Sequence, residues 1–319
     1  MAHLIETMVY VAEKPWHGLG NQLTSNQPIE VWAKQAGMNF DIKETPVRFM
    51  TESVGSLGAI MSFPDQKVLY RSDTKAALSV VSNRYQVVQP MEILEFYRDL
   101  TEISGFELET AGVLKGGRKI WALAKTNQSA TLKGNDQVNG YLLLATACDG
   151  TLATTAQFTS IRVVCNNTLA VALANGNGAV KVPHSTSFDP QAVKRQLGVS
   201  VSSWDGFMYR MKVLSERKVK SHESMNYFLR VFNDPNLSTT NISNERAMKK
   251  VQDLFEGHGK GAELASAKGT AFGLLNAVTE YVDHERRARS TDHRLESAWF
   301  GAGANLKQKA LDQALLMVA

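Results

Sequence analysis

Residues 140–168 read GYLLLATACDGTLATTAQFTSIRVVCNNT and contain the longest apolar run of the chain. Residues 141–145 are continuously apolar, as in a buried strand, whereas residues 151–158 alternate as a return strand. Asp149-Gly150 lies between them and favours a two-residue hairpin turn. The stretch therefore predicts a central β-hairpin over residues 140–158 of an antiparallel sheet.

The segment directly after this hairpin is apolar but contains one arginine and a tight polar cluster. A guanidinium among apolar neighbours must be paired if it is buried, or must face a ligand. We therefore expect Arg162 to be the most consequential polar residue of the stretch, beside a structural or ligand-binding cluster of Cys165, Asn166 and Asn167. Cys148 and Cys165 are predicted to be buried thiols, although a disulfide between them is conceivable.

The rest of the N-terminal half has β-prone runs interrupted by Gly, Pro, Asp and Asn. Helices are predicted over 28–36 and 90–104, and a hairpin over 106–126 with a basic turn at its tip. A tight loop at 14–20 holds Trp16 and His17, of which His17 either caps a backbone group or binds a ligand. We also expect a short helix over 78–82, a polar loop over 130–138 and a helix over 169–174.

The C-terminal part has helical periodicity throughout. A Gly- and Asn-rich linker ends near residue 187, and helices are predicted over 190–216, 222–232, 244–255 and 269–287 and from 305. The predicted class is α+β. An N-terminal antiparallel, hairpin-rich sheet with helices (1–187) is followed by a mainly helical C-terminal region (188–319).

Composition predicts a soluble globular protein in the cytoplasm. The 319 residues are 44% hydrophobic and 21% charged, and no apolar run approaches the ~20 residues that cross a bilayer. Residues 1–160 have a net charge of −2 and residues 161–319 a net charge of +6. This asymmetry permits a polyanionic partner without requiring one, since a solvated basic face is the commoner explanation of such a surplus.

Catalytic motifs are weak in this sequence. Asp283 and His284 could contribute to a metal site together with nearby acids and imidazoles, but adjacent helical residues point about 100° apart. No phosphate-binding loop and no nucleophile motif occurs. We therefore predict no catalytic residue, no metal and no cofactor, and expect that the protein is not an enzyme.

Three motifs resemble a known family. They are PWHGLG at 15–20, FTSIRVVCNNTL at 158–169, and residues 269–301 with Asn276, Asp283-His284 and Phe300-Gly301. They resemble the phage/plasmid-like protein family, a domain of unknown function carried by phages and mobile elements. The resemblance covers nearly the whole chain and implies accessory DNA metabolism in a bacterial host cell. The predicted topology is also similar to that of phage single-strand annealing proteins of the lambda Red beta and Erf kind.

These features favour a homo-oligomeric protein that binds single-stranded DNA, promotes strand annealing or recombination, and does not act at a membrane. The predicted phosphate contacts are Lys115, Arg118, Lys119, Arg162, Arg210, Arg217 and Lys218, with Tyr85 or Trp121 for base stacking. One alternative is a metal-dependent nuclease or other enzyme centred on Asp283 and His284. Another is a protein-binding factor that acts on a host defence or replication protein.

Overall fold

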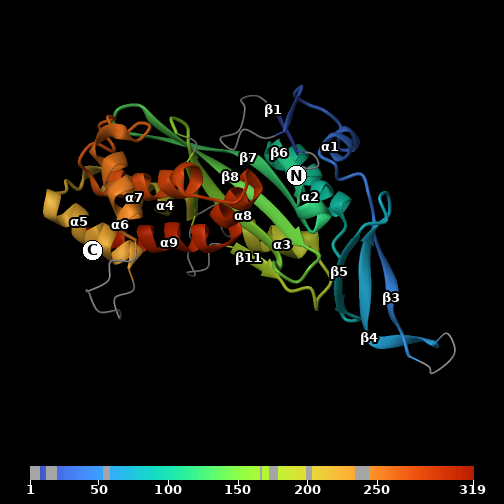
Figure 1. Cartoon of the computed structure of the whole chain (residues 1–319). Coiled ribbons are helices and arrows are strands. Elements are labelled where there is room, and N and C mark those ends of the chain that lie inside the picture. Colours follow the sequence, from blue (N-terminus) through green and yellow to red (C-terminus); the bar gives the residue numbers. More distant parts are fainter. Residues whose placement is uncertain are drawn as a thin grey trace.

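The computed structural model describes residues 8–11, 20–52, 58–165, 167–171, 179–198, 203–233 and 244–319. Most strands lie in the N-terminal half and most helices in the C-terminal part, which confirms the predicted α+β class. Figure 1 shows the central sheet with helical layers packed on it. Within the described ranges, no helix has both the length and the apolar character that crossing a bilayer requires.

A large, mostly antiparallel sheet forms the centre of the molecule. Its strand order is β10-β9-β8-β7-β6-β1-β2, β11 pairs with a further part of β9, and only β1 and β2 are parallel. The strands are β1 (Met8–Val11), β2 (Asn21–Leu23), β6 (Glu107–Leu114), β7 (Lys119–Leu132), β8 (Asp136–Ala147), β9 (Thr154–Arg162), β10 (Asn167–Ala170) and β11 (Ala179–Val182).

The predicted central hairpin is formed by β8 and β9. Their register pairs Val138 with Arg162 at one end and Ala145 with Thr155 at the other. In the turn, the Thr151 backbone N–H donates to Asp149 Oδ1 at 3.0 Å, and Gly150 has a φ of 75°, which glycine adopts without a Cβ clash. The hairpin is therefore confirmed, but its connection is longer than the predicted two-residue turn, because β8 ends at Ala147 and β9 begins at Thr154.

Two neighbouring predictions are wrong. Residues 130–138 are not a polar loop, because β7 runs to Leu132 and β8 starts at Asp136 after a short turn. Residues 169 and 170 are not helical, because they belong to β10 and pair with Ser160 and Thr159 of β9. In both cases pairing with the adjacent strand of the sheet satisfies the backbone, and this outweighs local propensity.

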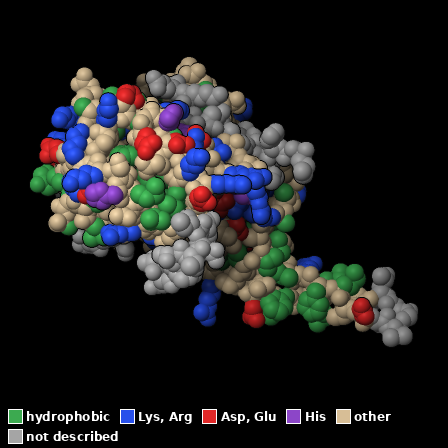
Figure 2. Space-filling model, turned by 60° about the vertical axis from the view of Figure 1, so that its left-hand side comes forward, with side chains coloured by type: hydrophobic (Ala, Val, Ile, Leu, Met, Phe, Trp, Pro, Cys, Tyr) green, Lys and Arg blue, Asp and Glu red, His purple; other side chains and the backbone are tan. Residues whose placement is uncertain are grey.

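A second sheet projects from the body as an arm (Figures 1 and 2). It consists of β3 (Ile42–Met50), β4 (Ile60–Arg71) and β5 (Ala77–Ser82), all antiparallel. Because β5 pairs only with residues 66–70 of β4, the outer part of the arm is a two-stranded ribbon. The helix predicted over 78–82 is wrong, since these residues pair with β4 as a strand.

Helices α1 (Ile29–Gln35) and α2 (Pro90–Ser104) pack on one face of the large sheet, as predicted (Figure 1). Pro90 stands at the first turn of α2, and Gly105 ends the helix with a φ of 65°. The Tyr97 hydroxyl lies 2.8 Å from the Ala122 carbonyl oxygen and 3.0 Å from that of Leu142. This contact ties the helix to β7 and β8 within the apolar core.

The C-terminal helices form the other part of the body (Figure 1). They are α3 (Pro190–Gly198), α4 (Ser203–Glu216), α5 (Ser221–Phe232), α6 (Glu245–Asp253), α7 (Ala271–Glu280), α8 (Thr291–Phe300) and α9 (Ala302–Leu315), with π-helical turns η2 (Leu254–His258) and η3 (Tyr281–Glu285). The described residues of the predicted helix 190–216 form α3 and α4. Helix α8 was not predicted. It covers the second face of the sheet, where Trp299 packs edge-on against Trp121 with 4.9 Å between ring centroids.

Candidate functional site

A set of buried polar side chains lies where β8, β9 and β10 meet the C-terminal helices. We call this set the polar seam. The sheet contributes the motif residues singled out in the sequence, and α7, η3 and α9 contribute their partners. The seam consists of Asp136, Arg162, Cys165, Asn167, Thr168, Ser266, Asn276, Glu280, Asp283, His284 and Lys307. Since most of these side chains are removed from water, their partners decide what the seam can do.

Arg162 and Asp136 form the first ion pair of the polar seam. Arg162 Nε lies 2.9 Å from both carboxylate oxygens of Asp136, and Nη2 lies 2.8 Å from Oδ2. Arg162 Nη2 also donates to the Gly261 carbonyl oxygen at 2.9 Å, and Ser266 Oγ donates to Asp136 at 2.6 Å. The guanidinium lies over the ring of Phe272. Arg162 is therefore buried and paired, and it links the sheet to the loop before α7.

Asp283 and Lys307 form the second ion pair. Lys307 Nζ lies 2.8 Å from Asp283 Oδ1 and donates to Thr168 Oγ1 at 2.7 Å. The other carboxylate oxygen accepts from the Thr168 backbone N–H at 2.8 Å and from its hydroxyl at 3.0 Å. Burial lowers the pKa of the Lys307 ammonium, and the attraction of Asp283 opposes that shift. This pair ties β10 to η3 and α9.

Between the two ion pairs lie the polar groups of the CNNT motif. Asn167 Nδ2 donates to the Asn276 carbonyl oxygen at 3.3 Å, whereas the buried Asn167 Oδ1 has no hydrogen-bond partner among the described residues. A cavity of about 20 Å³ lies beside Asn167, Arg162 and Asn276 and has room for about one water molecule. Asn166 lies outside the described residues. A water bound there would satisfy the Asn167 oxygen.

Cys165 lies in the same seam as a free, buried thiol. Burial raises the pKa of this thiol to about 11, although the neighbouring Arg162 favours the thiolate. A reactive cysteine needs a lowered thiol pKa and access to solvent. Cys148 is also free and buried, with its pKa raised to about 12 by burial. Both cysteines are therefore thiols of the protein interior, as predicted.

Asp283 and His284 point to different partners. His284 Nε2 lies 3.0 Å from the Cys165 carbonyl oxygen, while the Asp283 carboxylate faces Lys307 and Thr168. In the part of the chain that the structure describes, no three His, Cys, Asp or Glu side chains are placed to share a metal ion. The seam is thus a network of ion pairs and hydrogen bonds between protein groups. Its geometry fits a role in holding the sheet to the helices.

His284 makes the stability of the protein depend on pH. Burial lowers the pKa of its imidazole from the ordinary 6.5, while Asp283 opposes that shift and Lys260 adds to it. Just below pH 6.5 the unfolded chain therefore binds more protons than the folded one, and stability decreases as the pH falls. We expect the melting temperature to drop between about pH 7 and pH 5, and to drop less in His284→Gln. Equal pH profiles for the two proteins would contradict this assignment.

The structure separates the predicted phosphate contacts. Lys115 and Lys119 lie at the tip between β6 and β7, and both contact Glu296 Oε1, at 2.7 and 2.5 Å. The remaining predicted cations are divided between this tip, the seam and the helical body. Arg118 is exposed and Arg210 half-buried; Arg162 pairs with Asp136, Arg217 with Glu223 at 2.6 Å, and Lys218 Nζ donates to the Lys268 carbonyl oxygen. Four of these seven are therefore buried or half-buried against a carboxylate, at sites far apart in the chain.

The two aromatic residues predicted to stack on bases lie in different surroundings. Trp121 is buried between β7 and α8 and offers no face to a base, whereas Tyr85 stacks on His184 with 4.4 Å between ring centroids. Trp16 and His17 lie outside the described residues. The predicted cluster is thus represented in the structure by Cys165 and Asn167 alone.

An arginine cluster between η3 and α8 was missed in the sequence. We define it as Arg286, Arg287, Arg289 and Arg294. Arg287 and Arg289 are exposed, while Arg286 Nη1 and Arg294 Nε are buried atoms without a hydrogen-bond partner among the described residues. The only hint in the sequence was the density of charge in the run RRAR at 286–289. Buried guanidinium donors of this kind need an acceptor.

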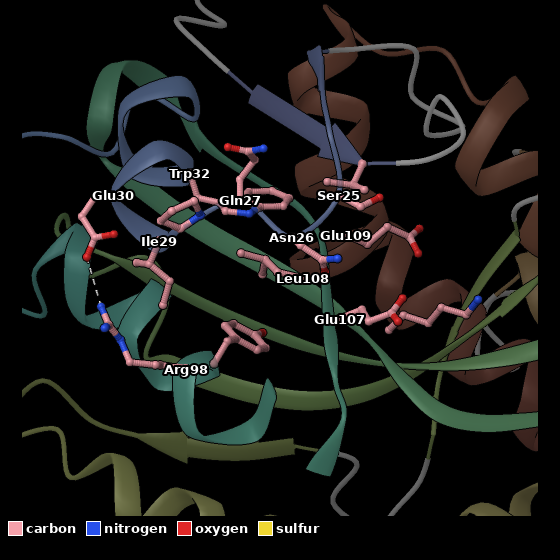
Figure 3. Close-up of a pocket in the computed structure, with 14 residues that line it drawn as sticks. Ser25, Asn26, Gln27, Ile29, Glu30, Trp32, Arg98, Glu107, Leu108 and Glu109 are labelled. Carbon is pink, nitrogen blue, oxygen red and sulfur yellow. Dashed lines mark hydrogen bonds and ion pairs between the residues drawn. The ribbon is translucent and has the colours of Figure 1, made fainter. Parts of the chain in front are cut away.

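A cavity larger than the one beside Asn167 lies next to α1 and α2 (Figure 3). It measures about 470 Å³ and is lined by parts of α1, α2, β6 and the turn before α1. Glu30 and Arg98 form an ion pair at one end, and Glu107 lies toward the other end, opposite Lys125 in the strand register. The volume suits a small ligand. No His or Cys lies among its described lining residues, and charges of both signs surround it.

Comparison with known proteins places the chain in a family without assigning it an activity. Searches of curated proteins and of solved structures give no match. A family model described as "Domain of unknown function (DUF932)" matches residues 77–299, from β5 to α8, and so includes the central hairpin, the arginine cluster and every residue of the polar seam except Lys307. The chain therefore belongs to the DUF932 family.

Proposed function

We propose that this protein binds single-stranded DNA without catalysing a reaction on it, as an accessory protein of phage or mobile-element DNA metabolism that promotes strand annealing. One observation carries the proposal. In the arginine cluster, Arg286 Nη1 and Arg294 Nε are buried donors that have no acceptor among the described residues. A phosphate oxygen supplies an acceptor with the charge and geometry that guanidinium groups prefer.

The surroundings of the arginine cluster support an anionic partner. Residues 286–294 hold four arginines and one acidic residue. The nearest preceding acid, Glu285, is already paired with Lys250 at 3.1 Å. Arg294 Nη1 donates to the His284 carbonyl oxygen, and this hydrogen bond fixes the orientation of the guanidinium group. Arg287 and Arg289 are exposed, and among the described residues no carboxylate forms an ion pair with them, so they are available to phosphates.

The basic tip of the β6–β7 hairpin lies near the same helix. Lys115 and Lys119 both contact Glu296, which lies in α8 two residues after Arg294. Arg118 is exposed beside them. Helix α8 thus carries Arg294 of the arginine cluster and also Glu296, which contacts the two lysines next to Arg118. A single strand that follows this helix would meet both groups of cations.

We expect tight, salt-sensitive and sequence-independent binding of a labelled oligo(dT) in fluorescence anisotropy. If about four phosphates are neutralised, log affinity should fall against log salt with a slope of roughly −3, because each single-strand contact contributes about −0.7. The pair Arg287→Ala and Arg289→Ala should flatten the slope by about one and a half units and weaken all sequences alike.

The matched control replaces two exposed cations elsewhere, Lys34 in α1 and Arg195 in α3, by alanine. This pair should leave the slope and the affinity unchanged. An equal loss in both double variants would mean that general positive charge, and not the arginine cluster, binds DNA. No binding by the folded protein at about 50 mM salt would overturn the proposal.

A further inference from the structure

The outer part of the arm exposes apolar side chains that the rest of the described chain leaves uncovered, with Met50 and Ile60 on one face and an aromatic set on the other. The register places Val47 opposite Phe63 and Phe49 opposite Met61, so these four side chains share one face of the ribbon. We call it the arm face. Phe49, Met61 and Phe63 expose 49%, 48% and 42% of their surfaces. Figure 2 shows hydrophobic side chains along the projecting arm.

A two-stranded ribbon with this composition needs support. Isolated two-stranded hairpins are marginally stable in water. Residues 60–65 of β4 pair with β3 but with no third strand among the described residues. The exposed aromatic and thioether groups would gain from being removed from water. Burial of the arm face against another molecule is therefore favoured over its exposure to water.

The chemistry of the arm face selects its occupant. The four side chains carry no charge, and Arg48 is on the opposite face, across from Ser62. A polyanion would find no cations on the arm face, and anionic lipid would find none either. Two identical uncharged faces can meet around a two-fold axis without placing like charges opposite one another. We propose that the arm face packs against the arm face of a second copy of this chain.

The contact uses side chains and not the strand edges. Pro46 in β3 and Pro64 in β4 each lack a backbone N–H, and proline in an edge strand opposes the addition of another strand. The available area sets the strength of the contact. Two half-exposed phenylalanines and one methionine offer on the order of 300 Å² per copy, or roughly 600 Å² in total. Stable interfaces bury at least about 1,200 Å², so the dimer is reversible and dissociates on dilution.

Sedimentation velocity of the full chain between about 10 μM and 1 mM tests the proposal. The wild type should shift from monomer toward dimer over this range. Phe49→Glu should remain monomeric, because it places two carboxylates opposite one another across the two-fold axis. Met50→Glu is the matched control: Met50 is the next residue, is 65% exposed and lies on the opposite face, so the dimer should persist.

A cross-linking experiment tests the same face by a different chemistry. Both natural cysteines are buried, so Met61→Cys introduces an exposed thiol that should form a covalent dimer with a mild oxidant, while Met50→Cys should not. A wild type that stays monomeric at the highest concentration overturns the proposal. So does an equal effect of the Phe49 and Met50 variants, or a monomer that binds neutral phosphatidylcholine vesicles through Phe49. The inference does not rest on the proposed DNA binding.

Discussion

Replacing Arg162 by alanine is expected to lower the free energy of unfolding by about 3–5 kcal/mol. The change leaves the Asp136 carboxylate buried, with the Ser266 hydroxyl as its remaining side-chain partner. A buried charge that has lost its counter-ion keeps its desolvation cost without the attraction that offset it. Denaturant unfolding followed by circular dichroism measures the loss, which should appear as a lower midpoint with an unchanged slope.

A double-mutant cycle separates the ion pair from general damage to the core. Arg162→Met and Asp136→Asn together remove both charges, so the double variant should be more stable than the sum of the single losses implies, by about 1–3 kcal/mol. Arg98→Ala is the matched control. Arg98 also pairs with carboxylates, at 3.2 Å from Glu30 and 2.7 Å from Glu95, but at the surface, and its loss should change stability little. Additive losses at Arg162 and Asp136 would contradict the pairing.

Lys307→Met is expected to destabilise the protein to a similar extent, about 3–5 kcal/mol, because Asp283 is fully buried and loses its only cationic partner among the described residues. Adding Asp283→Asn should restore part of the loss. Lys309→Met is the control on the same helix: Lys309 donates to the Asn233 carbonyl oxygen and pairs with no carboxylate in the described structure. Equal losses in the two single variants would mean that helix α9, and not the ion pair, is sensitive to substitution.

The same variants distinguish the ion pair from a metal centre. With Lys307 Nζ held 2.8 Å from Asp283, the carboxylate already has its counter-ion. We therefore expect a chelator to leave the melting temperature and DNA binding unchanged. Stoichiometric metal in the purified protein that is lost in Asp283→Asn would instead favour the nuclease alternative.

Local signals in the sequence predicted much of the fold. The Asp149-Gly150 turn, the proline at the start of α2 and the glycine at its end all mark element boundaries through backbone conformations that the structure adopts. Predictions failed where pairing with a neighbouring strand outweighed local propensity. Residues 78–82, 130–138 and 169–170 are strands or turns because β4, β7, β8 and β9 complete their hydrogen bonds. Periodicity within a short window does not contain that information.

The sequence by itself determined that Arg162 needs either a partner or a ligand, since a guanidinium in an apolar segment cannot be buried alone. Only the tertiary structure decided which. Asp136 pairs with it from 26 residues earlier and Gly261 from 99 residues later. In the same way, the sequence presents Lys119 as a free cation, but α8 brings Glu296 against it. Arg286 and Arg294 each keep a buried donor without an acceptor in the described part of the chain. Charge is a property of each residue, but whether that charge is available to a partner depends on what the fold places beside it.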